Sequence, residues 1–120
     1  MLTAFSYRSL SLSQSITAIF AKRLKAARAM RGLSQRALGA AVTGDKANGS
    51  VRINRYEQEV NRADMDTAAA LAQALDVPLA YLFTEEDDQA ELLLAFAKLG
   101  KSQRAHALAL VQEMASKQTK

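Results

Sequence analysis

The chain has 120 residues, of which 49% are hydrophobic, and it contains no cysteine and one histidine. A chain of this length buries one modest core, so we expect a single small domain without a second catalytic unit. The lack of cysteine excludes disulfides, thiolate catalysis and Cys-based zinc sites, and His106 alone cannot form a histidine metal cluster. We therefore expect no metal, no cofactor and no enzymatic activity.

The charges are unevenly divided along the chain. Residues 1–62 carry eleven Lys or Arg and three Asp or Glu, a net charge of +8. Residues 63–120 carry five Lys or Arg and nine Asp or Glu, a net charge of −4. A basic half beside an acidic half indicates that the first half meets a polyanion, because phosphate contacts supply most non-specific nucleic-acid affinity. A solvated charged surface remains the alternative for any single residue.

The composition favours helices. Alanine and leucine dominate, proline occurs once, and β-branched or aromatic residues form no alternating run, so we predict an all-α fold. No apolar run approaches the roughly 20 residues that span a bilayer. The N-terminus has no basic stretch leading into an apolar one. We therefore expect a cytoplasmic protein.

The first elements are marked by caps and small residues. Residues 1–13 mix serines with isolated apolar residues and predict a flexible N-terminal arm, or a short strand that pairs across a dimer. Apolar residues at helical spacing predict a helix from about Ser15 to Arg31, which ends at a left-handed Gly32. Ser34 can cap a second helix, in which Gly39 and its alanine neighbours would let another helix approach closely.

The strongest turn signal of the chain is Thr43–Gly49. After this link we expect a third helix from about Ser50 to Glu59. Ile53 and either Tyr56 or Val60 would face the core, and the intervening polar residues would stay outside.

Four further helices are predicted from capping residues. Asp64 can cap a fourth helix whose buried stripe begins at Met65, and Pro78 is placed to open a short fifth one. Thr84, followed by four acidic residues, predicts the solvated start of a sixth helix. A metal cluster in this acidic run is the weaker reading, because adjacent carboxylates on a helix point in different directions. Ser102 can cap a seventh helix.

The last two helices carry apolar stripes that a short tail cannot cover alone. Either they pack against the other helices or they form a dimer surface, which we favour. The stripe residues are Leu92, Leu93, Phe96, Leu108 and Val111. We thus divide the chain into an arm (1–13), a main domain (14–84) and a C-terminal helical extension for dimerisation (85–120).

Short motifs occur in a defined order over about residues 20–84. They are Arg23-Leu24, Arg28, Gly32-Leu33-Ser34-Gln35, Leu38, Ile53, Arg55-Tyr56-Glu57, Leu71-Ala72-Gln73-Ala74-Leu75, Val77 and Leu82-Phe83. Their order and spacing resemble the helix-turn-helix domain of the phage lambda repressor/Cro type, also called Xre-like. The resemblance implies a five-helix lambda-repressor-like domain, here with two additional C-terminal helices, whose third helix reads double-stranded DNA.

The chain departs from this family in one place. The path from Leu33 to Glu57 is about four residues longer than is usual, and the excess falls in Gly44–Gly49. We expect this insertion to loop out before the third helix.

The resemblance also assigns roles to individual residues. Aligned on Arg55-Tyr56-Glu57, it implies base contacts from the third helix and a structural ion pair between Arg28 and Glu57. The expected base-contacting residues are Ser50, Val51, Arg52, Asn54 and Arg55. The expected phosphate-contacting residues are Gln35, Arg36, Lys46 and Arg62.

The chemistry of these side chains suits the roles. Arg can donate two hydrogen bonds to guanine, Asn can pair with adenine, and Val51 could pack on a thymine methyl group. Gln35 offers an amide beside the positive end of a helix, which favours phosphate. A solvated helix face is the alternative for Arg52, Asn54 and Arg55.

Two functions from different classes follow. The first is a sequence-specific transcriptional regulator, most simply a repressor that binds a palindromic operator as a homodimer. The second is a protein-interaction module, such as an antitoxin that neutralises a protein partner through its C-terminal helices. An enzyme is the weakest reading, because no nucleophile–base pair, phosphate-binding glycine loop or metal-ligand spacing is present in the sequence.

Overall fold

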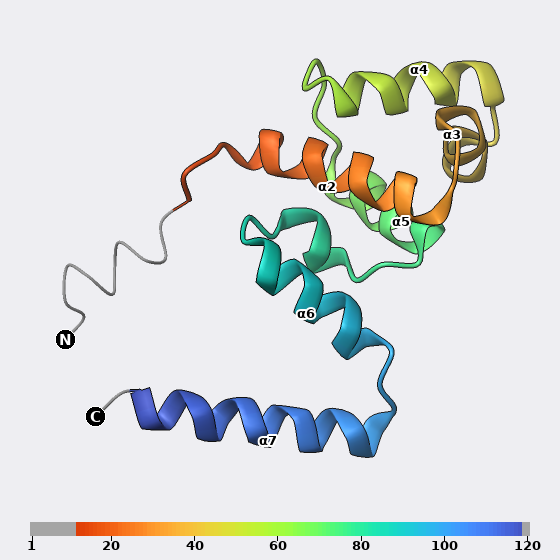
Figure 1. Ribbon diagram of the computed structural model, residues 1–120. Coiled ribbons are helices and arrows are strands. Elements are labelled where there is room, and N and C mark those ends of the chain that lie inside the picture. Colours follow the sequence, from red (N-terminus) through yellow and green to blue (C-terminus); the bar gives the residue numbers. More distant parts are fainter. Residues whose placement is uncertain (1–11, 119–120) are drawn as a thin grey trace.

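The computed structural model describes residues 12–118, and within this range all regular secondary structure is helical, as predicted (Figure 1). The expected arm, residues 1–13, therefore lies almost wholly outside the described residues. The helices are α2 (Ile16–Arg31), α3 (Gln35–Thr43), α4 (Lys46–Glu57), α5 (Met65–Leu75), the 3₁₀ helix η1 (Leu79–Phe83), α6 (Asp87–Ala97) and α7 (Lys101–Gln118).

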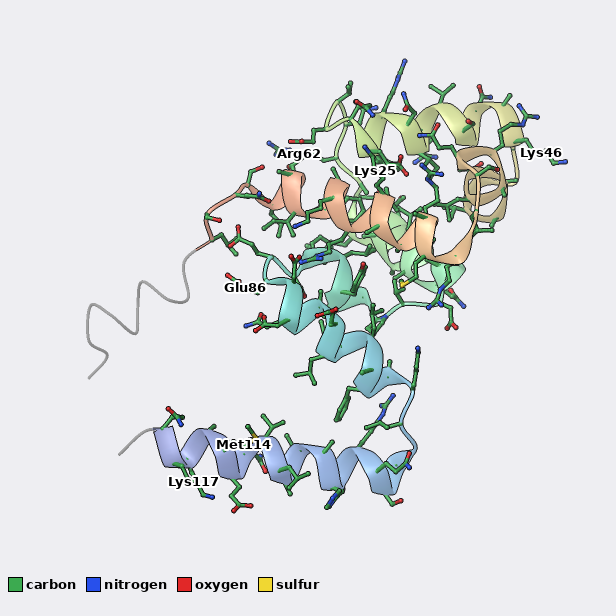
Figure 2. The ribbon with its side chains drawn as sticks, viewed as in Figure 1. Lys25, Lys46, Arg62, Glu86, Met114 and Lys117 are labelled. Carbon is green, nitrogen blue, oxygen red and sulfur yellow. The ribbon has the colours of Figure 1, made fainter. Side chains whose placement is uncertain are left out.

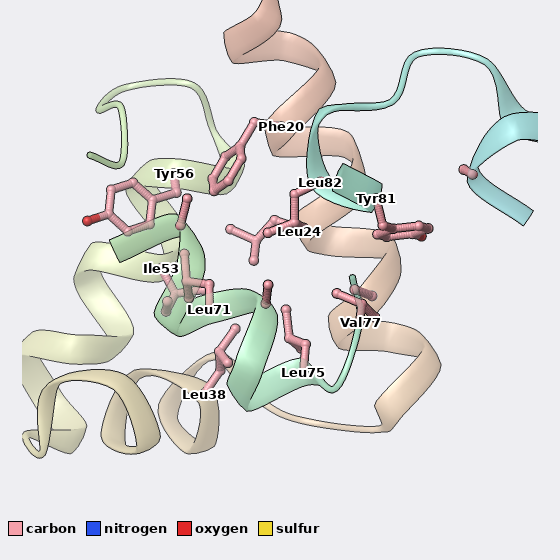
Figure 3. Packing of buried hydrophobic residues seen from close by; sticks show 14 residues of the cluster. Phe20, Leu24, Leu38, Ile53, Tyr56, Leu71, Leu75, Val77, Tyr81 and Leu82 are labelled. Atoms are coloured by element: carbon pink, nitrogen blue, oxygen red, sulfur yellow. The ribbon is translucent and has the colours of Figure 1, made fainter. Parts of the chain in front are cut away.

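The first five helices share one hydrophobic core. Figure 3 shows α2, α3, α4, α5 and η1 converging on side chains such as Leu24, Ile53 and Leu71, which are almost completely buried. Each helix contributes one apolar stripe, so none of them could bury its stripe alone. The buried cluster comprises Phe20, Leu24, Ala27, Leu38, Ile53, Tyr56, Ala68, Leu71, Ala72, Leu75, Val77, Tyr81, Leu82 and Ala90.

Most of the predicted helix ends are present. The Ser15, Ser34 and Asp64 side chains accept hydrogen bonds from backbone amides in the first turns of α2, α3 and α5. Gly32 ends α2 with a φ of 68°, the left-handed conformation that costs glycine least. These ends were predictable because a cap is a local interaction between residues close in sequence.

The expectations about Met65 and Thr84 were wrong, and one open alternative is resolved. Met65 is 89% exposed, because it is the first residue of α5 and lies before the helix enters the core. Of the two residues offered for the second core position of α4, Tyr56 is buried, and Val60, which follows the end of the helix, is exposed. Thr84 does not cap α6: its hydroxyl donates to the Ala80 carbonyl, and the helix begins only at Asp87.

The acidic run before α6 is more than a solvated helix start. The Glu85 carboxylate accepts hydrogen bonds from the amides of Ser13 and Gln14, and the Asp87 carboxylate forms ion pairs with Lys22 and Arg23. These contacts join the beginning of α6 to the beginning of α2. Among the described residues, no group of three acidic or histidine side chains is placed to hold a metal ion.

Three arginines bind the carbonyl ends of other helices. Arg23, which is buried, donates to the carbonyls of Thr84 and Glu85 at the end of η1. Arg31 donates to the last carbonyls of α5, and Arg104 donates to the carbonyls of Ala97 and Leu99 after α6. The last carbonyls of a helix lack partners within it, so a guanidinium there satisfies them and complements the helix dipole.

Helix α7 stands apart from the rest of the molecule (Figure 1). A short connection joins it to α6, and it lies apart from the five-helix core. None of its residues is buried. Within residues 12–118, no helix is both long and apolar enough to cross a membrane.

Candidate nucleic-acid interface

Helix α4 starts about one turn earlier than predicted. It begins at Lys46 instead of Ser50, and it ends at Glu57. The insertion at Gly44–Gly49 therefore does not loop out, which corrects our expectation. Gly44 ends α3 with a φ of 77°, and the Asp45 side chain accepts hydrogen bonds from the amides of Ala47 and Asn48, so the added residues fold as helix.

A close contact between two glycines positions this longer helix. A Cβ atom built on Gly39 would lie 2.3 Å from the Gly49 carbonyl carbon, and one built on Gly49 would lie 2.6 Å from the Gly39 carbonyl carbon. Any side chain at either position would force the two backbones apart. Gly39 in mid-helix thus has the packing reason that its sequence position suggested, and its partner is the added turn of α4.

The helical repeat divides α4 into an inner and an outer face. Gly49, Ile53 and Tyr56 are buried against the other helices. Residues about half a helical turn away from Ile53 face outward, and among them Val51 is 49% exposed and Arg55 is also exposed. Arg52 and Asn54 lie on the flanks of this face, and both are exposed.

Ser50 is not part of the outer face. Because α4 begins four residues earlier than expected, Ser50 lies inside the helix rather than at its start. It is half-buried, and its backbone nitrogen lies at the crossing with Gly39.

A polar network holds α4 to α2 and α3. Arg28 Nε donates to Glu57 Oε2 at 2.7 Å and Arg28 Nη2 donates to Glu57 Oε1 at 3.1 Å, so the expected ion pair is present and bidentate. The Glu57 side chain is only 1% exposed. The hydrogen bond to Glu57 raises the pKa of Arg28 above its ordinary value.

Gln35 belongs to the same network. Its Nε2 atom donates to Glu57 Oε1 at 3.1 Å and to Asn54 Oδ1 at 3.2 Å. An amide group has two hydrogens to donate, so both are used within the protein. Gln35 therefore orients Asn54 and Glu57, and phosphate contact from its side chain requires one of these bonds to open.

Several cations near α4 have no partner. Among the described residues, the side chains of Arg36, Arg55, Arg62 and Lys46 make no hydrogen bond or ion pair. Figure 2 shows Lys46 at the start of α4 and Arg62 in the loop that follows the end of α4. Arg52 Nη2 donates to the Tyr56 hydroxyl at 3.0 Å, which leaves its other donors available.

The extra turn adds one polar residue that we did not predict as a site residue. Asn48 is exposed, and it lies three residues before Val51 and seven before Arg55, a spacing that places all three on one helix face. The sequence does contain a signal for this earlier helix start: Asp45 and Asn48 are three residues apart, the spacing of an N-cap residue and a polar residue in the first turn.

Comparisons with known proteins agree with this geometry. Residues 24–82 match the sequence profile of the family described as helix-turn-helix. The crystal structure of the transcriptional regulator BswR is similar with a TM-score of 0.76 and 38% sequence identity, over 82% of this chain and 97% of that one. No curated protein matches the chain significantly. With its five-helix core, the α3–α4 unit and these matches, the chain belongs to the lambda repressor/Cro-type, Xre-like helix-turn-helix family.

Proposed function

We propose that the protein is a sequence-specific DNA-binding transcriptional regulator, and that α4 enters the major groove. The observation that carries this proposal is the outer face of α4, where Val51, Arg52 and Arg55 are exposed on a helix whose inner face is fixed in the core. A major groove admits one α-helix, and Arg and Val are side chains that can read guanine and thymine edges. Asn54 contributes from the flank of this face.

The free cations support phosphate contacts on both sides of the groove. Helix α4 has 12 residues, which gives it a length of about 18 Å; Lys46 is its first residue, and Arg62 lies in the loop after its last one (Figure 2). A major groove is about 12 Å wide between its two backbones. We assign phosphate contacts to Lys46, Arg62 and Arg36, and, at lower occupancy, to Gln35 because its amide is engaged by Glu57.

We further propose that the protein acts as a homodimer, through α6 and α7, and represses by occupying a palindromic operator. The α7 side chains Leu108, Leu110, Val111 and Met114 are 46–67% exposed, and a group of exposed apolar side chains on one helix is typical of a surface that packs against a partner. Two-fold symmetry would place two copies of α4 about 34 Å apart, on successive turns of one DNA face.

The same exposed helix supports a second candidate function, an antitoxin or similar module that binds another protein through α7. The two candidates differ in what covers α7. A chain that remains monomeric when purified alone, and that forms a stable complex with the product of an adjacent gene, would favour the second candidate.

Selection of bound fragments from random DNA tests the leading proposal. We expect an enriched, roughly palindromic site, bound with an affinity that falls linearly with salt on logarithmic axes. Arg55→Ala should lose affinity mainly for this site, and Arg62→Ala should weaken binding to all sequences and reduce the salt slope by about 1. Gln73→Ala, on an exposed position of α5, is the control. If no sequence is enriched, the regulator proposal fails.

A further inference from the structure

We infer that Asn48, in the added first turn of α4, reads an adenine in the operator and that Asp45 holds its side chain ready to do so. This inference rests on the proposed function and extends it, because Asn48 lies in residues that exceed the usual length of the family's link. It assigns a specificity-determining residue to the insertion.

The hydrogen bonds around Asp45 fix the orientation of the Asn48 amide. Asn48 Nδ2 donates to Asp45 Oδ2 at 2.8 Å, while Asp45 Oδ1 accepts from the amides of Ala47 and Asn48 at 3.1 and 3.2 Å. These bonds lower the pKa of Asp45 below its ordinary value, so the carboxylate stays ionised and can only accept. The nitrogen of Asn48 must therefore face Asp45, and the amide cannot turn over without losing this bond.

The atoms that remain are the ones that an adenine requires. After one Nδ2 hydrogen is given to Asp45, Asn48 retains its second Nδ2 hydrogen and both lone pairs of Oδ1. Among the described residues, these groups have no other partner. Adenine presents the N7 acceptor and the N6 donor in the major groove, and Asn pairs with both at once. A guanine presents two acceptors there and would leave Oδ1 without a donor.

The position of Asn48 on α4 indicates which base pair it would read. Asn48 precedes Arg55 by seven residues on the same face, so their Cα atoms are about 10 Å apart along the helix axis. This equals about three base-pair steps of roughly 3.4 Å each. We therefore expect Asn48 to read a pair about three steps from the one that Arg55 reads, beyond the reach of a helix that began at Ser50.

A fixed side chain loses little freedom when it binds. A free Asn must adopt one rotamer on DNA, whereas the bond to Asp45 selects that rotamer beforehand. The negative charge of Asp45 opposes DNA approach, and its hydrogen bonds to Ala47 and Asn48 and the neighbouring Lys46 reduce this effect. Asp45 is thus a positioning residue and Asn48 is the contacting one.

The test is a selection from random DNA with the full chain, in parallel for the unchanged protein, Asn48→Ala, Asp45→Ser and the control Gln73→Ala. We expect Asn48→Ala to lose the preference for one A·T pair, by roughly 5- to 150-fold, and to keep all other preferences. Asp45→Ser retains a helix cap but removes the carboxylate oxygen that accepts from Asn48 Nδ2. It should therefore weaken only the preference for that A·T pair. Gln73→Ala should change nothing.

The outcomes separate this inference from the proposed function. If the unchanged protein and Asn48→Ala enrich identical sites, Asn48 reads no base and the inference is overturned, while the regulator remains. If Asn48→Ala loses all preferences equally with a lowered melting temperature, its role is structural and the inference is again overturned. If the unchanged protein enriches no site, both the inference and the proposed function fail.

Discussion

Glu57 is a charged residue with a structural role on the helix that we propose contacts DNA. Its carboxylate is 1% exposed and accepts hydrogen bonds from Arg28 and Gln35. Both partners lie on other helices, so Glu57 fixes the end of α4 to α2 and α3. A pair of this kind specifies an arrangement, because removing Arg28 leaves the Glu57 charge buried and removing Glu57 leaves a half-buried Arg28 without its partner.

Removal of Glu57 should therefore be costly. We expect Glu57→Ala to lower the free energy of unfolding by about 3 kcal/mol, since Arg28 would remain as an uncompensated charge. Urea denaturation followed by circular dichroism measures this change. In the double variant Arg28→Met with Glu57→Leu, the loss should be smaller than the sum of the single losses. Glu91→Ala, on an exposed position of α6, is the matched control. An equal effect at Glu57 and Glu91 would contradict the assignment.

The free energy of unfolding should depend on pH because four hydrogen-bonded or ion-paired carboxylates lie at or near the starts of helices. Hydrogen bonds lower the pKa values of Asp45, Asp64 and Glu85, and the Arg23 guanidinium lowers that of Asp87. A carboxylate with a lowered folded-state pKa stabilises the fold above its unfolded-state pKa, and this contribution is lost as the pH falls through the folded value. The free energy of unfolding should thus be flat above about pH 5 and decline below about pH 4.

Asp64→Asn tests this acid dependence. The variant should lose stability at neutral pH and show a shallower decline in acid, as measured by urea denaturation between about pH 7 and pH 3. Asp66→Asn is the control, because the Asp66 side chain accepts no hydrogen bond from the described residues. If both variants show the same pH profile, the Asp64 cap does not contribute in this way.

At the scale of elements, the close crossing of α3 and α4 depends on two glycines. Replacing glycine by alanine in a helix normally stabilises it by up to about 1 kcal/mol. At Gly49 the new Cβ would meet the backbone of Gly39 at 2.6 Å, and neither backbone can yield without moving its helix. The free energy lost through this backbone clash should exceed the free energy gained from the higher helix propensity of alanine.

We accordingly expect Gly49→Ala to destabilise the protein by about 2 kcal/mol and to weaken operator binding further by displacing α4. Thermal unfolding and a binding titration give the two values. Gly100→Ala is the matched control, because a Cβ there would meet nothing within 4 Å and the φ of Gly100 is not positive. A Gly49→Ala variant that is as stable as Gly100→Ala would show that the helices do not cross this closely.

At the scale of the whole molecule, α7 is the exposed element: within residues 12–118, no other part of the chain buries any of its residues. Leu108, Val111 and Met114 follow one another at three-residue spacing, and Leu110 lies four residues before Met114, so the four side chains form one broad face of the helix. Arg104 donates to the carbonyls of Ala97 and Leu99 and so ties the start of α7 to the end of α6. The dimer that we propose would cover these exposed apolar side chains. The α6–α7 extension is therefore suited to join two DNA-binding cores.

The double variant Leu108→Glu with Val111→Glu should convert the proposed dimer to a monomer in sedimentation equilibrium, because buried carboxylates would oppose association. Its affinity for a full palindrome should fall much more than its affinity for a half-site. Gln118→Glu adds charge at the end of the same helix and should leave the dimer intact. If the unchanged protein is itself a monomer, the dimer proposal fails.

The sequence alone determined the helical class, the family resemblance and most helix ends. Caps such as Ser34 and Gly32, and apolar stripes such as the one that buries Leu71, depend on residues within a few positions of one another, so they can be read from the chain. The Arg28–Glu57 pair was predictable only because a resemblance supplied it, since these residues are far apart in sequence.

Only the tertiary structure decided which basic residues are free and where α4 begins. Arg23 and Arg31 donate to backbone carbonyls more than 40 residues away, whereas Arg36 and Arg55 are unpaired among the described residues. Nothing in the sequence distinguishes the two pairs of arginines. The glycine-rich link reads locally as a turn. It folds as helix because Gly49 can pack directly on Gly39, and a contact between two helices is not a property of either segment alone.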